Sequence, residues 1–580
     1  MEEKSWTDKL VDFVFSKSTV KYVLLIAILG AILRFVIAKN IGFLGDEMVH
    51  GPHAIGILNK FVLSRMTQSI VWFYLTDIAH KILGVTAIST RFLSIFFGIL
   101  IIPIVYLLGK EFYNKKVGLT AAFLLSISAF TLRYTLIEMD ITAIFFVLVA
   151  MLFFIKKAKQ GKFSYLAALF LGIGSLVKSS AFFFIPAFLI WFYVIQEKPR
   201  KKVFSKSKKS LIVFLIIAAL MYTPILAHNY LLYKDKGIVD VYFSKYFNIN
   251  REVYAYQAGV DVPFVLKDIF VGGPKMLFDI IKMDPLIMLL GIFGIFLMFR
   301  KKDRANKSLL FLSTIIPFLV LSISVLLQTH FVIIMPFMAI FAASSIEELT
   351  KKFSNKKILY LILLAIFIIN LYLILPHLTS QSAIIKTRNY AKEIPNDALV
   401  VVDGRFYTGR TVWMFYDKIY LESNYLGGFL TDLDSSTSQK VPIDLYFVEC
   451  LTDDCGWGTI KDQPELNQTM EDLASFLKQD AVLVKTFNGG GGYVEKTGEP
   501  TVAIYNRKIL LQPEIFLLAK QTHYWWGYSV NYEKESYDSY NVYGLFDNLI
   551  KLLASVILIL AIILAALSPL LLIPFWKKYT

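Results

Sequence analysis

Residues 23–33 read VLLIAILGAIL, and residues 45–50, GDEMVH, follow shortly after them. The first stretch belongs to an apolar run over 22–38 that is long enough to cross a bilayer, and the second contains two adjacent carboxylates. Ionisable side chains are costly inside lipid, so this change predicts a membrane-spanning helix that ends at a polar loop. No small-residue cleavage site follows the run, which favours a signal anchor over a removable leader.

The same apolar pattern recurs along the chain. Of its 580 residues, 56% are hydrophobic, and the mean hydropathy is +0.59. This composition predicts a polytopic α-helical membrane protein with about twelve transmembrane helices. The expected spans lie near residues 22–38, 86–108, 117–134, 141–156, 163–178, 180–196, 211–228, 285–299, 307–327, 331–347, 357–376 and 546–576.

The net charge of +16 is high, and much of the excess lies in short basic clusters between the expected spans. Such clusters mark the cytoplasmic side of a membrane protein, so they need no nucleic-acid partner. Lysines near both termini place those ends in the cytoplasm as well. The segments expected outside the cytoplasm are 39–85, the turn at 134–141, Lys178, 229–284, 328–330 and 377–545.

Residues 377–545 differ from the rest because this short part of the chain holds half of its acidic residues and many turn-forming residues. Four short apolar runs predict buried strands at 399–402, 443–448, 481–484 and 501–504, and residues 470–479 have a helical pattern. We therefore expect a transmembrane domain over 1–376, a small extracytoplasmic α/β domain over 377–545 and a last transmembrane helix in 546–580. Cys450 and Cys455 lie in this outer domain, where a local disulfide is plausible.

Ionisable side chains gather at the outer ends of the expected spans. A carboxylate there could take the proton from an acceptor hydroxyl, while lysine and arginine could neutralise a phosphate leaving group. Together these side chains fit displacement at a sugar carbon that is bonded to a lipid phosphate. The acids are Asp46, Glu47, Glu138 and Asp140, and the basic residues are Arg133, Lys178 and His330.

Each of these residues also has a structural interpretation. Asp46 and Glu47 could begin an interfacial helix, Glu138 and Asp140 could pair with Arg133, and Lys178 could extend towards lipid headgroups. An unbroken helix would place Asp46 and His50 on one face, with His53 nearby, as ligands for a divalent metal ion such as Mg, Mn or Zn. Gly51-Pro52 interrupts that helix, so a metal site is the weaker interpretation.

An ordered series of motifs resembles the PMT/ArnT-type membrane glycosyltransferases of the GT-C fold, which use polyprenyl- or dolichyl-phosphate sugars. FLGDEMVHGPHAIGILN resembles the first outer loop of that family, and RYTLIEMDITAIFFVLVAMLFF resembles its second acidic motif. The resemblance extends over roughly residues 20–350. The motifs lie at 43–59, 72–113 with its pattern around Arg91, 133–154, 171–190 with its outer lysine, and 330–343.

The resemblance implies a role for several residues. Asp46, or Glu47 beside it, is the expected catalytic base, and one of Glu138 and Asp140 is the second acid. Lys178 and Arg91 are expected to contact the lipid phosphate, with Arg133 and His330 as further phosphate contacts. His330 stands where the family usually has arginine, and a neutral histidine would bind an anion less firmly.

The sequence therefore predicts an integral membrane glycosyltransferase with its site on the extracytoplasmic face of the cell membrane. It would transfer one sugar, mannose or a related hexose, from a donor such as dolichyl-phosphate mannose to a protein, glycan or lipid acceptor. The alternative is a polytopic transporter or lipid flippase, which predicts inverted repeats and charges near span centres. A non-catalytic receptor would leave the acidic residues at the outer face unexplained.

Overall fold

The computed structural model describes most of the 580 residues. The residues outside the description are 1–17, 44–46, 60, 65–69, 135–138, 196–199, 250–267, 301–302, 325–327, 353–355, 435–437, 453–454, 456–463, 491–494, 496, 522–523, 526–527, 530–539 and 580. Two of the expected site residues, Asp46 and Glu138, fall in these gaps.

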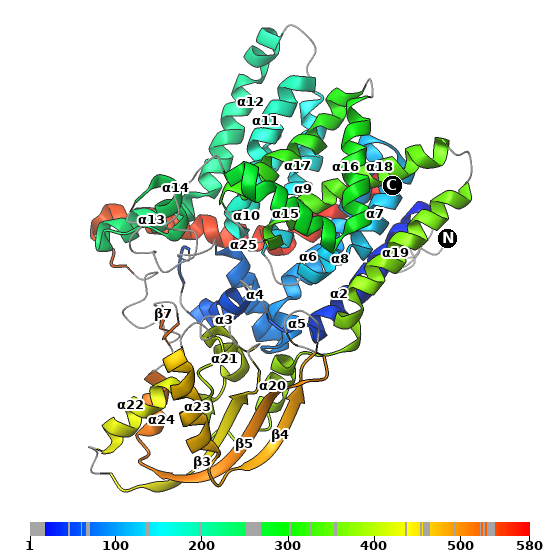
Figure 1. Cartoon of the computed structure of the whole chain (residues 1–580). Coiled ribbons are helices and arrows are strands. Elements are labelled where there is room, and N and C mark those ends of the chain that lie inside the picture. The colour runs from blue at the N-terminus through cyan, green and yellow to red at the C-terminus, as the bar shows by residue number, and fades with distance from the viewer. Residues whose placement is uncertain are drawn as a thin grey trace, which may run out of the picture.

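The described helices form a bundle with a smaller α/β domain at one end (Figure 1). Seven helices are long and apolar enough to cross a membrane, or eight if a pair bent by 51° counts as one span. The expected polytopic helical class is confirmed, whereas the count of twelve spans stays a prediction. The bundle helices are α2 (Ser18–Asn40), α6 (Phe92–Phe112), α7 (Lys115–Ile127), α8 (Ala129–Tyr134), α9 (Asp140–Ala158), α10 (Tyr165–Val177), α11 (Phe184–Ile195), α12 (Arg200–Met221), α13 (Thr223–Lys236), α16 (Pro285–Phe299), α17 (Arg304–Ser324), α18 (Met335–Lys352), α19 (Lys356–Thr379) and α25 (Gly544–Tyr579).

Local sequence accounts for how the helices begin and pack. The side chain of Asn114 accepts hydrogen bonds from the first amides of α7, and Ser164 does the same for α10. Where α6 turns back into α7, a Cβ on Gly109 would lie 2.7 Å from the Cα of Gly118. Small residues are therefore required for the two backbones to approach this closely.

Shorter elements lie at the ends of the bundle helices. Helices α3, α4 and α5 lie between the bundle and the α/β domain (Figure 1). The 3-10 segments η2 and η4 continue directly into α11 and α18, where they shape the candidate site. These elements are α3 (Glu47–Ala54), η1 (Ile57–Asn59), α4 (Val71–Leu83), α5 (Ala87–Thr90), η2 (Ser179–Phe183), α14 (Val241–Phe247), α15 (Asp268–Met283) and η4 (Gln328–Ile334).

The α/β domain is built on a five-stranded sheet in the order β2-β1-β3-β5-β4. Strand β1 pairs in parallel with β2 and β3, and β5 pairs antiparallel with β3 and β4. The strands are β1 (Leu399–Val402), β2 (Ile419–Glu422), β3 (Val441–Cys450), β4 (Val482–Asn488) and β5 (Pro500–Leu511), and a separate pair joins β6 (Tyr524–Trp525) to β7 (Tyr528–Ser529).

Helices pack on both faces of this sheet. One apolar cluster joins α20 and α21 to strand residues such as Val400 and Val448, and it includes Phe43 of the first outer loop. A second cluster on the other face joins α22, α23 and α24 to residues such as Val401 and Phe447. These helices are α20 (Ala383–Ala391), α21 (Thr408–Phe415), α22 (Ser423–Asp434), α23 (Pro464–Lys478) and α24 (Ile515–Gln521).

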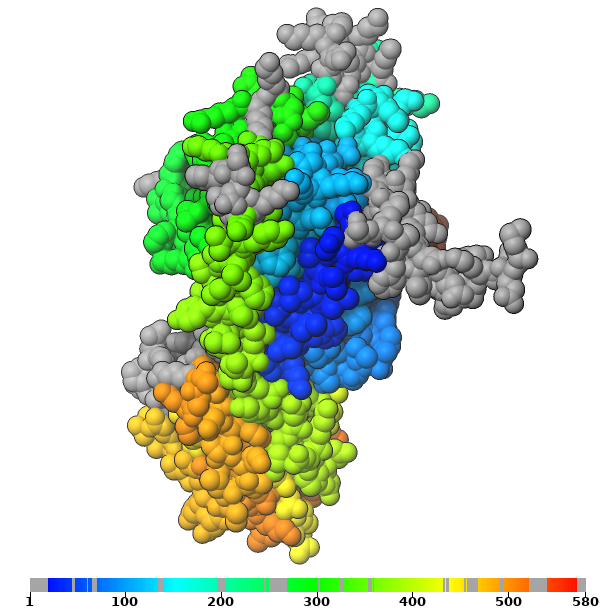
Figure 2. Space-filling model, turned by 90° about the vertical axis from the view of Figure 1, so that its right-hand side faces the viewer, coloured from blue at the N-terminus to red at the C-terminus, as the bar shows by residue number. Residues whose placement is uncertain are grey.

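The four expected strands and the expected helix are all present, as β1, β3, β4, β5 and α23. Strand β2 was not expected, because its four residues carry too short an apolar run to be recognised. The structure contains the Cys450–Cys455 disulfide. Figure 2 shows α19 running beside α2 into the α/β domain, so the first described helix lies against the entry to that domain.

Candidate functional site

Three separate elements bring Asp140, Lys178 and His330 together. Asp140 is in the first turn of α9, where the positive end of the helix dipole favours a carboxylate. Lys178 joins α10 to η2 in an extended conformation, and His330 belongs to η4. The Lys178 Nζ atom lies 2.6 Å from Asp140 Oδ2, and His330 Nδ1 lies 2.8 Å from the same oxygen.

The approach of α10 to α9 depends on a glycine. A Cβ on Gly174 would lie 3.3 Å from the Cβ of Phe146 and 3.4 Å from the carbonyl oxygen of Ala143, both on α9. That spacing is tight for any larger residue. Gly174 also accepts the backbone N–H of Lys178, at 2.8 Å, which sets where the chain leaves the helix.

The three polar side chains are buried, and their charges therefore depend on one another. Asp140 is fully buried, and Lys178 and His330 are each 5% exposed. A buried charge that loses its partner is strongly destabilising, so Asp140 is needed to keep Lys178 charged in this position. The hydroxyl of Ser180 donates to the other carboxylate oxygen of Asp140, at 3.2 Å.

His330 can contact its neighbours in two ways. Its Nδ1 atom lies 2.7 Å from Lys178 Nζ and 2.8 Å from Asp140 Oδ2. With the proton on Nε2, Nδ1 accepts from the lysine, and with the proton on Nδ1 it donates to the aspartate. In either tautomer Lys178 carries the positive charge and His330 adds a hydrogen-bonding ring nitrogen, and such a pair can bind an anion such as phosphate.

Glu47 and Arg91 form a second buried cluster. Arg91 donates from Nε to Glu47 Oε1 at 2.5 Å and from Nη2 to Glu47 Oε2 at 2.6 Å. Its remaining donor hydrogens reach the carbonyl oxygens of Ala38 at 2.6 Å, Ile41 at 2.8 Å and Gly42 at 3.1 Å. A guanidinium has five donor hydrogens, and these contacts use all of them.

This saturation changes the interpretation of both residues. The sequence assigned Arg91 to the lipid phosphate and Glu47 to the base or its helper. In the structure they bind each other, with Arg91 1% exposed and Glu47 3% exposed. We interpret Arg91 as the residue that fixes the first outer loop, because its hydrogens are already engaged, and Glu47 as its anchor.

The other expected residues are placed as follows. Asp46 and Glu138 lie outside the described residues, so their roles stay predictions. Arg133 is in the last turn of α8 and is partly exposed. His50 and His53 are buried in α3, and the ring of His50 packs edge-on against Phe73 with centroids 5.7 Å apart.

Within the described part of the chain, no group of three or more His, Cys, Asp or Glu side chains could hold a metal ion. His50 contacts the aromatic rings of Trp72 and Phe73. Asp46, the third expected ligand beside His50 and His53, lies outside the described residues, so the divalent metal stays a prediction.

Sequence reasoning missed several polar residues around the site. Asp77 accepts the backbone N–H of Gly56 at 3.0 Å and of Leu58 at 2.9 Å, and so fixes the chain after α3. Ser180 follows Lys178 closely, and that adjacency could have identified it. Arg410 and Trp413 contact the first outer loop from the α/β domain, and no local signal marks them.

Comparison with known proteins supports the expected class. Residues 67–228 match the family described as dolichyl-phosphate-mannose-protein mannosyltransferase. The crystal structure of ArnT from Cupriavidus metallidurans bound to undecaprenyl phosphate superimposes with a TM-score of 0.54 at 9% identity, covering 84% of this chain and 98% of that chain. The resemblance to the PMT/ArnT-type GT-C family is confirmed.

Two further solved structures are similar to the chain to different degrees. The apo structure of the same ArnT gives a TM-score of 0.50 at 9% identity, with the same coverage of 84% and 98%. An oligosaccharyltransferase from Archaeoglobus fulgidus in the apo form gives 0.44 at 13% identity, covering 87% of this chain and 77% of that chain. No curated protein sequence matches the chain significantly. Residues 67–228 thus resemble a mannosyltransferase family, and the superposition on ArnT shows that the chain shares the fold of that protein.

Proposed function

We propose that this protein transfers one sugar, mannose or a related hexose, from a polyprenyl- or dolichyl-phosphate donor to an extracytoplasmic protein, glycan or lipid acceptor. The observation that carries the proposal is the convergence of Asp140, Lys178 and His330 from three helix ends in a chain of GT-C fold. A buried lysine–histidine centre is suited to a phosphate leaving group, and the carboxylate keeps it in place.

The proposed reaction is a displacement at the anomeric carbon. The acceptor hydroxyl oxygen forms the new bond to that carbon while its proton passes to the carboxylate of Asp46. The bond from the anomeric carbon to the phosphate oxygen breaks, and the lipid phosphate leaves with the electron pair. Lys178 and His330 neutralise the charge that develops on this phosphate, and the anomeric configuration inverts.

Asp140 has a supporting role in this scheme. Its carboxylate oxygens are engaged by Lys178, His330 and Ser180, and so it orients the cationic groups. Of the two candidates for the second acid, we assign this orienting role to Asp140, since Glu138 lies outside the described residues. We place the site on the extracytoplasmic face because the α/β domain lies at the same end of the bundle as the first outer loop.

The test uses the purified full-length chain in lipid nanodiscs. Radiolabelled polyprenyl-phosphate mannose is offered with hydroxyl-bearing peptides, glycans and lipids as acceptors. We expect label in one acceptor class, and we expect Asp46→Asn and Lys178→Met to lose it. Lys234→Met is the matched control, because Lys234 also pairs with a carboxylate but does so outside the site. Its Nζ atom lies 2.7 Å from Asp547 Oδ2.

Three outcomes would contradict parts of the proposal. Undiminished turnover in Asp46→Asn removes that residue from the base role. Undiminished turnover in Lys178→Met removes the phosphate site assigned here. In a parallel experiment in sealed proteoliposomes, movement of the labelled lipid across the bilayer, with no label in any acceptor, would favour a flippase.

A further inference from the structure

Two arginines from distant parts of the chain hold the residues on either side of 44–46. Arg91 of the bundle binds Glu47, as described above. Arg410 of α21 in the α/β domain donates from Nη2 to the carbonyl oxygen of Phe43 at 3.1 Å and from Nε at 3.3 Å. Phe43 is therefore held from the outer domain, and Glu47 is held from the bundle.

Phe43 is the point at which the two anchors meet. Its ring lies under the guanidinium of Arg91, with 4.7 Å from Cζ to the ring centroid, and packs edge-on against Trp413 with centroids 4.0 Å apart. Phe43 and Trp413 are fully buried. A residue held on two faces by side chains, and at its carbonyl by a third, has little freedom to move.

Trp413 makes a further contact with the bundle. Its Nε1 atom donates to Thr90 Oγ1 at 3.2 Å, and Thr90 directly precedes Arg91. The same tryptophan thus touches both Phe43 and the turn that carries the other anchor. Any shift of α21 would disturb both ends of the segment together.

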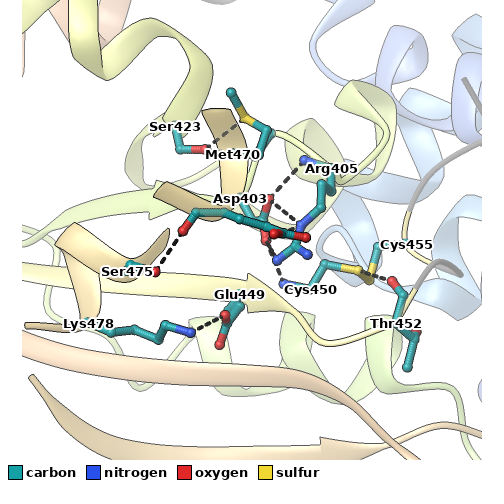
Figure 3. Close-up of polar contacts among 12 residues, drawn as sticks. Asp403, Arg405, Ser423, Glu449, Cys450, Thr452, Cys455, Met470, Ser475 and Lys478 are labelled. Carbon is teal, nitrogen blue, oxygen red and sulfur yellow. Dashed lines mark hydrogen bonds and ion pairs between the residues drawn. A yellow bond between two sulfur atoms is a disulfide. The ribbon is translucent and has the colours of Figure 1, made fainter. Parts of the chain in front are cut away.

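Arg410 is itself fixed within the α/β domain. Its Nη1 atom donates to the carbonyl oxygen of Cys455 at 2.7 Å, and Cys455 is joined to Cys450 by the disulfide. The backbone N–H of Cys450 donates to Asp403 Oδ2 at 3.1 Å, beside the end of β1 (Figure 3). The guanidinium therefore connects the sheet to the outer loop.

The bundle and the α/β domain also contact each other closely where α2 ends. The backbone N–H of Ser382 donates to the carbonyl oxygen of Asn40 at 2.8 Å, and a Cβ on Gly42 would lie 2.6 Å from Ser382 Oγ. Residues 40 to 43 thus lie against the outer domain along their length.

We propose that Arg410 and Trp413 are positioning residues for catalysis, which fix the first outer loop at Phe43, three residues before Asp46 in the sequence. This inference rests on the proposed function, because it assigns importance to Asp46. It gives the α/β domain a task that is independent of the acceptor. Loss of Arg410 should therefore slow transfer even to a short acceptor that is too small to bind the domain.

The first experiment measures the loop and needs no transfer. Hydrogen exchange of backbone amides in 38–50 is compared between the full-length protein and Arg410→Gln. The control is Arg507→Gln, because Arg507 lies in the same domain but donates to the carbonyl oxygen of Phe476 on α23, at 3.0 Å, and α23 packs on the opposite face of the sheet from α21. We expect exchange to rise about tenfold or more in Arg410→Gln and not in the control. Equal exchange in both variants would overturn the inference.

The second experiment measures turnover with a short acceptor. A small displacement of a catalytic group can cost about 100-fold in rate, so we expect Arg410→Gln to lower kcat by about that factor. The KM for the lipid donor should change by less than about threefold, because the donor contacts are untouched. Arg410→Lys should restore part of the rate, and Trp413→Phe, which keeps the ring contact but removes the bond to Thr90, should lose less.

The outcomes separate the inference from the proposed function. If Asp46→Asn is inactive while Arg410→Gln keeps full kcat, the positioning role is wrong and the function stands. If Asp46→Asn keeps full turnover, the proposed base is wrong, whatever the exchange shows. Should the Arg410 variants fail to fold, Trp413→Phe alone decides: faster exchange in 38–50 with a lower kcat supports the inference, and unchanged values overturn it.

Discussion

The buried contact between Asp140 and Lys178 predicts a marked non-additivity. Their charged atoms are 2.6 Å apart, and the side chains are 0% and 6% exposed. Removing one partner of such a pair costs about 3–5 kcal/mol, because the other charge is left uncompensated, whereas replacing both by apolar or neutral groups costs far less. We expect Asp140→Asn and Lys178→Met each to lower the free energy of unfolding by about that amount.

The double variant Asp140→Asn/Lys178→Met should recover most of this loss. The measurement is unfolding of the purified full-length chain in one detergent, followed by loss of near-ultraviolet circular dichroism. The coupling between the two substitutions is obtained from the four proteins of the cycle. If the free energy of unfolding of the double variant falls by the sum of the two single decreases, the two side chains do not depend on each other and our account of the site is refuted.

Three further predictions concern the outer domain and its junction. Burial raises the pKa of Glu422 to about 7 from an ordinary value of 4.5, so the stability that this carboxyl contributes is full below pH 4.5 and is lost as the pH rises to about 7. Unfolding compared at about pH 5 and 8 should show a loss of about 3 kcal/mol in the parent, and Glu422→Gln should remove that loss. Replacing Cys450 and Cys455 together by serine should lower the unfolding free energy by about 2 kcal/mol, measured by urea unfolding. Gly42→Ala should cost about 1–3 kcal/mol, because its Cβ would meet Ser382, and a melting temperature equal to that of the parent would contradict this.

The meeting of Asp140, Lys178 and His330 could be foreseen from the sequence. Each lies at the outer end of an expected span, and alternation of spans puts all such ends on one face. Topology cannot say which of them touch, however. The short distances depend on Gly174, which lets α10 approach α9, and on the extended conformation at Lys178.

The pairing of Arg91 with Glu47 could not be foreseen in the same way. The motif around Arg91 suggested a phosphate contact, and a guanidinium serves that task and an ion pair equally well. Which one occurs depends on how α5 and α6 return to the end of α2. The contact of Arg410 with Phe43 was even harder to predict from the sequence. Arg410 lies in a domain whose helices were mostly not expected, and the neighbouring strand β2 has only four residues.

The two anchors of the first outer loop are made at very different times. Arg91 is 44 residues from Glu47, whereas Arg410 is 367 residues from Phe43. At a synthesis rate of about 5–20 residues per second, the first anchor follows within about 2–9 s and the second only after about 20–70 s. The nascent chain thus inserts the bundle helices up to α19 with the loop held at one end only, and the second anchor forms when the outer domain has been translated and folded.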